Sequence, residues 1–431
     1  MSLTVNDILR ATDARLPVGS PDTAIAGACV DSRAVAPGSL FVGIRGEVTD
    51  GGQYAMDALR AGAAAAVVRE SAWRWIEGEA QALRRPVMVA DDPLAILQRA
   101  GRLALERSGA RVVGITGATG KTTTKDILLA LLRAAGARAE GTPGNLNTEV
   151  GVPMSLLALA EETEIAVIEM GMRGIGQIAE LARLAPPDVA CITSIGPVHL
   201  ETLRTVEAVA AAKAEILGEL RPGGTAVVPA GEPLLEPHLA TLDPRVSVVR
   251  FSAEDAIDLN LSLSKGWERH NAAAALACCR ALGLTPPAGV PVEVDRSAMR
   301  GQERPLAGGG TLIEDCYNAN PIAMEAALLD LAGRPGRRVA VLGDMMELGA
   351  EEARYHREVG ERARELGIDL IVAIGQRAGA YADGGPEAVR FATVEEAVEG
   401  IAGHLRPGDT VLLKGSRSMM LERVGAALAG G

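Results

Sequence analysis

The chain has 431 residues, 48% of them hydrophobic, and a formal net charge of -12. This length is enough for roughly two to four domains. The acidic balance argues against a nucleic-acid-binding surface, and no run of about 20 uncharged apolar residues predicts a membrane span. The five cysteines are scattered without a CxxC pair, which is typical of reduced thiols rather than of a disulfide framework or a zinc site. The N-terminus has no apolar core of a secretory signal, so we expect a cytoplasmic protein.

Residues 1–95 are predicted to form a small α/β domain. Strand-like apolar segments lie at 27–35, 39–46 and 63–68, and a helical pattern at 52–62 ends at Gly62. A second helical segment, 93–109, leads into the next part of the chain.

Residues 96–298 and 299–431 are predicted to form two further α/β domains. The expected strands of the first are 111–116, 165–170, 189–195 and 225–230, and its expected helices include 121–136 and 270–283. The expected strands of the second are 311–317, 337–345, 370–375 and 410–416. Strands that alternate with helices favour mostly parallel sheets covered on both faces. We therefore expect a P-loop ATPase-like central domain and a Rossmann-like C-terminal domain.

The stretch GITGATGKTTTK, residues 114–125, predicts a phosphate-binding loop. The usual pattern G-x-x-x-x-G-K-[ST] would need glycine at position 115, which is Ile115, so the nearest glycine, Gly114, is one residue out of step. The stretch nevertheless follows a strand and opens a helix, where backbone N–H groups can bind a polyphosphate. Gly117 and Gly120 permit close approach, Lys121 can reach the phosphates and the Thr122 hydroxyl can bind Mg²⁺. The alternative is a plain glycine-rich turn between a strand and a helix.

Three further side chains, after the phosphate loop in the sequence, are candidate site residues. Glu169 ends an apolar strand at the ligand-binding edge of the sheet, and His199 follows the next strand. Lys213 lies in an alanine-rich helix of a chain that has five lysines against 38 arginines, so each retained lysine is a stronger chemical candidate. Each also has a structural reading: a capping acid, a structural histidine and a helix-surface lysine. We expect Lys125 to be a solvated helix residue.

Polar loops outside this series are less specific. Asn145 and Asn147 suit turn or ligand roles equally, and Asn271 fits either a helix N-cap or a purine contact. In the last third, polar loops follow the strands near 314–321, 342–349 and 412–420. Together these three loops favour a binding site on one face of the C-terminal domain.

These motifs resemble those of the Mur ligases, the ATP-dependent amide-forming enzymes of peptidoglycan precursor synthesis. GITGATGKTTTK matches the Mur loop T-G-x-x-G-K-[ST]-T, which accounts for the departure from the usual glycine spacing. The family branch that adds D-alanyl-D-alanine is matched by TPGNLNTEVGVPMSLL, IEMGMRGIGQI, IGPVHLETL, AAKAEIL, IEDCYNANP, AVLGDMMELG and VLLKGSRSMMLERV. The D-N-P-R signature of the diaminopimelate- or lysine-adding sibling is absent. VDSRAVAPGSLFVGIRGEVTDG resembles the UDP-sugar-binding domain, which folylpolyglutamate synthetases lack.

The resemblance implies roles for particular residues. The implied catalytic residues are Lys121, Glu169, His199, Lys213 and Arg300, the last matched by its spacing before Asp315. ATP is expected at Gly117, Ala118, Thr119, Gly120, Lys121, Thr122, Thr123, Asn271 and Asn318. Two Mg²⁺ ions are expected at Thr122, Glu169, His199 and Lys213, with Lys213 carbamylated. The UDP substrate is expected at Ser32, Arg33, Asn145 and Asn147, and the dipeptide at Asn320, Lys414, Ser416 and Arg417.

The reaction implied by the resemblance joins UDP-N-acetylmuramoyl-tripeptide to D-alanyl-D-alanine through an acyl phosphate, in a monomer. Two departures bear on substrate detail: the segment 246–270 is short for the family, and residues 50–52 read DGG where D-G-H is usual. The alternatives are a repurposed ligase for another carboxylate and amine, and an inactive scaffold that keeps the fold for binding.

Overall fold

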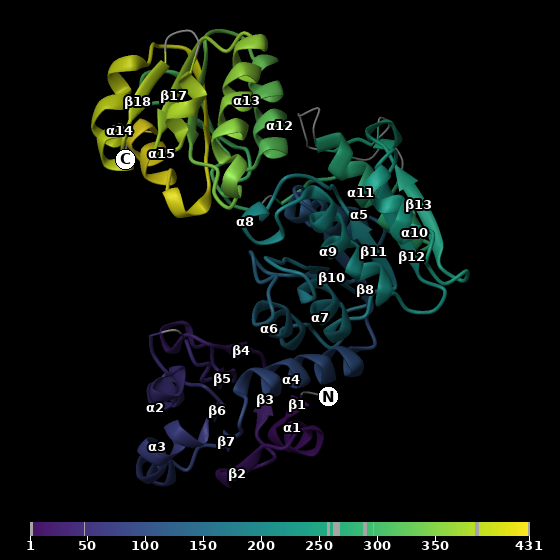
Figure 1. Ribbon diagram of the computed structural model, residues 1–431. Coiled ribbons are helices and arrows are strands. Elements are labelled where there is room, and N and C mark those ends of the chain that lie inside the picture. Colours follow the sequence, from purple (N-terminus) through teal and green to yellow (C-terminus); the bar gives the residue numbers. More distant parts are fainter. Residues whose placement is uncertain are drawn as a thin grey trace.

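The computed structural model describes residues 3–46, 48–256, 259–261, 268–287, 291–295, 297–383 and 388–429. Three parts of the chain, each built on its own sheet, follow one another from the purple N-terminal end to the yellow C-terminal end (Figure 1). The α/β class and the three-part architecture expected from the sequence are confirmed. Lys265, in the short segment 246–270, lies outside the described residues.

The N-terminal part has a five-stranded sheet with helices on both faces. Its strands, in sheet order, are β2 (Arg15–Val18), β7 (Val87–Val89), β6 (Ala65–Val68), β5 (Leu40–Val42) and β4 (Ala28–Cys29). A short separate ladder pairs β1 (Leu3–Thr4) with β3 (Ala24–Ile25). One face packs against α1 (Val5–Ala11) and α4 (Pro93–Ser108), the other against α2 (Ala55–Arg60) and α3 (Glu70–Leu83). Only β2 runs antiparallel to its neighbour in the five-stranded sheet.

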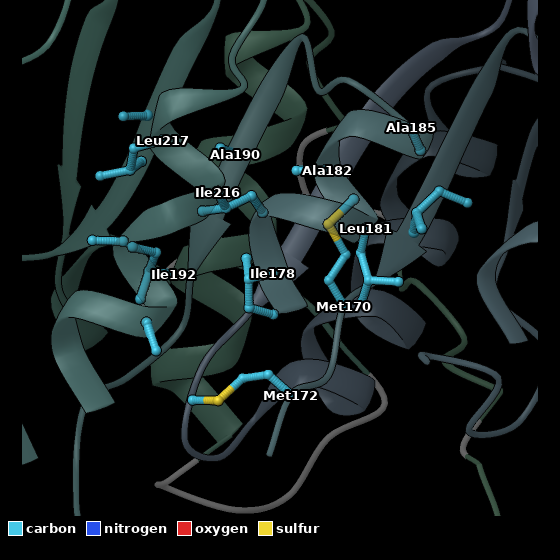
Figure 2. Close-up of a cluster of buried hydrophobic side chains, with 14 of the residues drawn as sticks. Met170, Met172, Ile178, Leu181, Ala182, Ala185, Ala190, Ile192, Ile216 and Leu217 are labelled. Carbon is cyan, nitrogen blue, oxygen red and sulfur yellow. The ribbon is translucent and has the colours of Figure 1, made fainter. Parts of the chain in front are cut away.

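The central part has a six-stranded sheet in which every pairing is parallel. Its strands, in sheet order, are β13 (Ser247–Phe251), β12 (Thr225–Pro229), β11 (Val189–Ile192), β8 (Arg111–Thr116), β10 (Ile165–Glu169) and β9 (Ala139–Gly141). One face is covered by α5 (Lys121–Ala134) and α11 (Glu268–Ala281). The other is covered by α6 (Gly151–Leu157), α7 (Gln177–Leu184) and α9 (Val206–Gly218). Figure 2 shows the second of these cores, where Met170, Ile178, Leu181, Ile192 and Ile216 meet.

The C-terminal part has a second six-stranded sheet, parallel except for β14 at one edge. Its strands, in sheet order, are β14 (Gln302–Pro305), β15 (Gly310–Glu314), β19 (Asp409–Lys414), β16 (Arg338–Gly343), β17 (Leu370–Ile374) and β18 (Ala388–Phe391). Helices α12 (Pro321–Ala332) and α13 (Glu352–Glu365) cover one face, and α14 (Val394–Gly400) and α15 (Glu422–Ala429) the other. The short helices α8 (Leu200–Leu203) and α10 (Glu236–Leu239) belong to the central part.

The central part contacts both of its neighbours directly. Helices α4 and α6 pack together, and a side chain on Gly101 would meet the backbone of Pro153 at 2.7 Å. On the opposite side, a side chain on Gly196 would overlap Ile322 of α12, and Tyr355 of α13 packs against the central core. Glycine therefore permits close approach at both junctions.

Most strands and helices expected from the sequence are present with shifted ends. Sequence reasoning did not predict eight short strands: β1, β2, β3, β7, β9, β13, β14 and β18. All of them except β7 lie at the edge of a sheet. Edge strands bury only part of their surface, so their apolar pattern is weak. The predicted boundaries at 95/96 and 298/299 stay predictions. Over the described part of the chain, none of the helices combines the length and apolar character that crossing a membrane requires.

Candidate active site

The predicted phosphate loop joins β8 to the N-terminus of α5. Gly117 has φ 151° and Gly120 has φ 85°, and Gly120 is the N-cap of α5 without a side-chain cap. The first N–H groups of a helix have no acceptor within the helix, so this end favours an anion. The Lys121 ammonium donates to the Gly117 carbonyl oxygen at 2.9 Å, which folds its side chain back over the loop. This geometry suits a polyphosphate in the way the sequence predicts.

Two residues that sequence reasoning missed support the loop from the end of β11. Ser194 accepts from the Ala118 N–H at 2.9 Å through its carbonyl, and from the Thr119 N–H at 3.0 Å through its hydroxyl. The Thr193 hydroxyl donates to the Thr119 carbonyl at 2.5 Å. A side chain on Gly117 would overlap the Thr193 hydroxyl, so glycine is required there. The only sequence signal was their place at the end of a predicted strand.

Glu169, at the end of β10, is hydrogen-bonded to the first turn of α5, directly after the phosphate loop. One carboxylate oxygen accepts from the Thr122 hydroxyl at 2.7 Å, and the other accepts from the Asn147 amide at 2.7 Å. The Glu169 N–H donates to the Thr142 hydroxyl at 2.9 Å. Glu169 and Thr122 are both buried, so their orientation is fixed. Two of the predicted metal ligands are thus adjacent, while Asn147, predicted to bind the UDP substrate, contacts Glu169.

Lys213, on α9, is a buried lysine without an ordinary counter-charge. Only 1% of the residue is exposed, and within the described residues its ammonium group has no hydrogen-bond partner. Burial and, to a lesser degree, the positive charge of Lys121 hold the pKa of Lys213 well below its usual range. Burial also lowers the pKa of Lys121, where the Glu169 carboxylate opposes the effect. The Lys213 amine is therefore favoured in its neutral, nucleophilic form.

Asn271 and His270, on α11, pack against the other side of the loop. Asn271 is buried, its side-chain oxygen accepts from the Thr124 hydroxyl at 3.4 Å, and a side chain on Gly120 would overlap it. The helix begins at Glu268, so the N-cap alternative for Asn271 is wrong. His270 is hydrogen-bonded to the Thr193 carbonyl at 2.9 Å. These contacts stabilise the loop, and an adenine contact of Asn271 stays a prediction.

Arg300 and Tyr317 reach the central part from the start of the C-terminal part. The Arg300 guanidinium lies 4.2 Å from the centre of the Tyr317 ring, a cation–π contact. The positive charge of Arg300 contributes to lowering the pKa of Lys121. Burial raises the pKa of Tyr317, and a hydrogen bond with Asn145 opposes this rise. The predicted Arg300 therefore contacts Tyr317, which sequence reasoning missed, and lies near enough to Lys121 for its charge to lower the pKa of that lysine.

His199 precedes α8 and is bound by the C-terminal part. Its ring atom Nδ1 forms a hydrogen bond with the Glu347 carboxylate, which lowers the pKa of Glu347. His199 has φ 54° and Glu347 has φ 64°. This left-handed conformation costs a non-glycine residue about 1–2 kcal/mol. Strain of this kind persists only where surrounding contacts impose it.

The Lys414 side chain, expected to bind the dipeptide, is engaged within the C-terminal part. Its ammonium donates to the Asp315 carboxylate at 2.7 Å, and to the carbonyls of Asn318 at 3.1 Å and Asp315 at 3.3 Å. Lys414 is buried, so it fixes the loop after β15. The exposed Asn318 accepts from its neighbour's N–H through its side chain. Asn320 caps α12 with its side-chain oxygen, and its buried amide nitrogen has no partner among the described residues.

The loop after β16 is supported by a buried network. His356 is fully buried, and its two ring nitrogens are hydrogen-bonded to the Met345 N–H at 3.0 Å and the Glu352 carbonyl at 2.8 Å. Burial lowers the pKa of His356. The Ser416 hydroxyl accepts from the Met346 N–H at 3.0 Å. Ser416 therefore links the loops after β16 and β19.

Four predicted residues remain, of which Ser32 and Arg33 are not joined to this cluster by any hydrogen bond or ion pair in the described part of the chain, while the charge of Arg417 acts on Tyr317. Ser32 and Arg33 lie in a 3-10 helix of the N-terminal part (Ser32–Ala34), where Arg33 pairs with Asp31 at 2.7 Å. The exposed Arg417 pairs with Glu422 at 2.7 Å. Thr123 lies in the first turn of α5.

The expectation for Lys125 is wrong. This residue is buried, and its ammonium donates to the Thr142 carbonyl at 2.8 Å and lies 3.4 Å from Asp126. The chain following β9 covers this face of α5, so the lysine contacts protein instead of solvent. Since Thr142 also receives the Glu169 N–H, Lys125 helps to hold the strand end that carries the predicted metal ligand.

The donor set at the phosphate loop suits Mg²⁺. Magnesium takes one or two protein carboxylates or hydroxyls and completes its shell with water and phosphate oxygens. The Thr122 hydroxyl and the Glu169 carboxylate, held at 2.7 Å, provide such a pair. Among the described residues, no group of three or more His, Cys, Asp or Glu side chains is arranged so that it could hold a metal ion.

Models of known protein families match successive segments of the chain. Residues 24–105 match the family model "Mur ligase family, catalytic domain", residues 115–275 the "Mur ligase middle domain" and residues 299–417 the "Mur ligase, glutamate ligase domain". The UDP-N-acetylmuramoyl-tripeptide–D-alanyl-D-alanine ligase of Bacillus subtilis is 33% identical, over 93% of each chain. The chain belongs to the Mur ligase family.

Further Mur ligases resemble the chain over nearly its whole length. The Escherichia coli protein of the same name is 31% identical, over 94% of each chain. A crystal structure of MurF from Acinetobacter baumannii superimposes with a TM-score of 0.85 and 28% identity, over 100% of this chain and 99% of that one. The MurF ligase of Thermotoga maritima, in complex with ADP, superimposes with a TM-score of 0.78 and 29% identity, over 94% of this chain and 97% of that one.

Proposed function

We propose that this Mur ligase joins D-alanyl-D-alanine to UDP-N-acetylmuramoyl-tripeptide with conversion of ATP to ADP and phosphate, in peptidoglycan precursor synthesis. The single observation that carries the proposal is Glu169, held between Thr122 of the phosphate loop and Asn147, at the sheet edge of a full-length relative of such ligases. A cytoplasmic location and a monomeric state stay predictions.

The first chemical step is transfer of the γ-phosphate of ATP to the terminal carboxylate of the tripeptide. The bond from phosphorus to the leaving ADP oxygen breaks, and a bond from phosphorus to a carboxylate oxygen forms. The N-terminus of α5 and Lys121 orient the phosphates, and Arg300 adds positive charge on the side of the C-terminal part. These groups oppose the repulsion between the carboxylate and the triphosphate.

The second step is attack of the dipeptide amine on the acyl phosphate. A C–N bond forms through a tetrahedral intermediate, the amine loses a proton, and inorganic phosphate leaves. No protein nucleophile is required. The contacts of the C-terminal part with the His199 loop and with Asn145 bring the two parts together around the reacting groups, which limits hydrolysis of the acyl phosphate by water.

The Mg²⁺ ions would be held by Thr122, Glu169, His199 and carbamylated Lys213. When bound, they neutralise charge on the phosphates and polarise the phosphoryl group. Carbamylation requires a neutral amine that attacks CO₂, and the buried, partnerless Lys213 supports this modification. The product is an anionic oxygen donor in a place where an unmodified ammonium would repel a metal.

The test is an ADP-release assay with UDP-N-acetylmuramoyl-tripeptide, D-alanyl-D-alanine and ATP, combined with mass spectrometry of the product. We expect ADP release that depends on both substrates, and a product one dipeptide heavier than the tripeptide substrate. A panel of tripeptides that differ in the third residue defines the substrate. Turnover only with another carboxylate and amine would contradict the proposal and favour a repurposed ligase, while no turnover with any pair would favour a binding scaffold.

A further inference from the structure

A contact between two loops joins the central and C-terminal parts beside His199. One loop, residues 199–201, opens α8, and the other, residues 347–349, follows β16. Figure 1 shows α8 at the junction of the teal and green parts. The contact lies outside the phosphate loop.

The contact combines side-chain and backbone interactions. The Glu347 carboxylate is hydrogen-bonded to Nδ1 of His199 and lies 3.8 Å from the Arg173 guanidinium. The Glu347 carbonyl accepts from the Glu201 N–H at 3.2 Å. A side chain on Gly349 would come within 3.3 Å of the Glu201 backbone, so the two loops pack backbone to backbone.

Glu347 belongs to the C-terminal part by sequence but contacts the central part. In the described chain, all of its polar contacts are with His199, Arg173 and Glu201. The neighbouring acid Glu351 differs, because it pairs with Arg354 of its own domain. A residue that serves only the stability of its own domain would pair within that domain, as Glu351 does.

The hydrogen bond determines which imidazole nitrogen remains available. A carboxylate can only accept, so Nδ1 of His199 carries the proton that it donates to Glu347. In the neutral ring, Nε2 then keeps the lone pair that a metal ion requires. Histidines that bind metals are oriented in this way by a partner on the other nitrogen.

We propose that Glu347 is a positioning residue through which the C-terminal domain orients His199 and fixes its tautomer, so that the proposed metal site is complete only when the two domains are docked. This inference rests on the proposed function, because that function makes His199 a metal ligand. The left-handed backbone of both His199 and Glu347 supports it, since the two strained residues meet each other at the junction.

The test compares Glu347→Ala with the matched control Glu351→Ala in the full chain. Without substrates, ¹⁵N chemical shifts of the histidine rings report the His199 tautomer, with His199→Gln used for assignment. Domain docking is measured as the distance between spin labels at Glu162→Cys and Glu361→Cys, two exposed positions in the central and C-terminal parts. The five native cysteines are buried, so these labels attach selectively.

We expect wild type and Glu351→Ala to show the Nδ1–H tautomer and one narrow distance distribution. Glu347→Ala should show a mixture of tautomers and a broader distribution, and should raise the Mg²⁺ concentration for half-maximal ADP release roughly 10- to 100-fold. Gly349→Ala, which keeps the carboxylate but crowds the same contact, should broaden the distribution in the same direction.

Two results would overturn the inference: an unchanged tautomer in Glu347→Ala, or changed docking with an unchanged Mg²⁺ requirement. The tautomer and the distance are read without substrates, so they separate this inference from the proposed function. If wild type fails to turn over the proposed substrates while Glu347→Ala shifts the tautomer, the reaction is wrong and the positioning contact stands.

Discussion

Asn147 provides the sharpest test of the site, because sequence and structure assign it to different partners. The sequence predicts a contact with the UDP substrate, whereas its amide donates to the Glu169 carboxylate at 2.7 Å. In Asn147→Ala, one oxygen of the buried Glu169 carboxylate loses its partner. Since a hydrogen bond to a charged group contributes about 1.5–3 kcal/mol, we expect kcat/KM to fall roughly 10- to 150-fold.

The assay separates the two roles by measuring which parameter changes. ADP release is followed over a matrix of Mg²⁺ and UDP-N-acetylmuramoyl-tripeptide concentrations. A residue that positions Glu169 should raise the Mg²⁺ requirement and lower kcat, leaving KM for the UDP substrate near that of wild type at saturating Mg²⁺. Ser32→Ala, in the predicted uridine loop, is the matched comparison and should raise that KM instead. A raised KM with an unchanged Mg²⁺ requirement in Asn147→Ala would refute the role as a Glu169 partner.

Three further predictions concern packing, pH and the buried lysine. Gly101→Ala should gain about 1 kcal/mol of stability from helix propensity but lose about 1–3 kcal/mol to overpacking at the α4–α6 contact. The control Gly78→Ala, in open space on α3, should only stabilise the protein. Equal stabilities of the two variants in urea unfolding would contradict the tight contact at Gly101. Burial lowers the pKa of His356, so the unfolded chain binds a proton that the folded protein does not. The urea midpoint should therefore be flat above about pH 6.5 and fall as the pH decreases below it; His356→Gln should remove this dependence and exposed His404→Gln should keep it. Lys213→Ala should abolish ADP release, and added short carboxylates should restore part of it. Intact-mass analysis of the wild-type protein should show one added CO₂. Loss of ADP release without this rescue, together with no added mass, would argue against the carbamate.

The parts of the site that lie within one strand–loop–helix unit could be predicted from the sequence. The glycine spacing, Lys121 and Thr122 stand next to one another in the chain, and apolar periodicity places β8 before them and α5 after them. The position of Glu169 in the site could also be predicted, because ligands bind at the edge of the sheet where parallel strands end. The roles assigned to these residues remain predictions.

The partners of these residues could not be predicted in the same way. Asn147 and Glu169 are 22 residues apart and Glu347 and His199 are 148 apart, and no local pattern encodes which of many polar residues will meet. The burial of Lys125 could not be predicted for the same reason. Its position on α5 suggested a solvent-exposed side chain, and only the folded structure places the chain following β9 over it.

The sequence by itself determined the alternation of the main strands and helices, the phosphate loop and the family, because these depend on periodicity and on short motifs that act through the local backbone. Only the tertiary structure decided that Asn147 holds Glu169, that Lys414 fixes its own loop and that Glu347 reaches His199. These contacts depend on how separate sheets and their loops pack, and packing is settled by the shape of the whole chain rather than by any one segment.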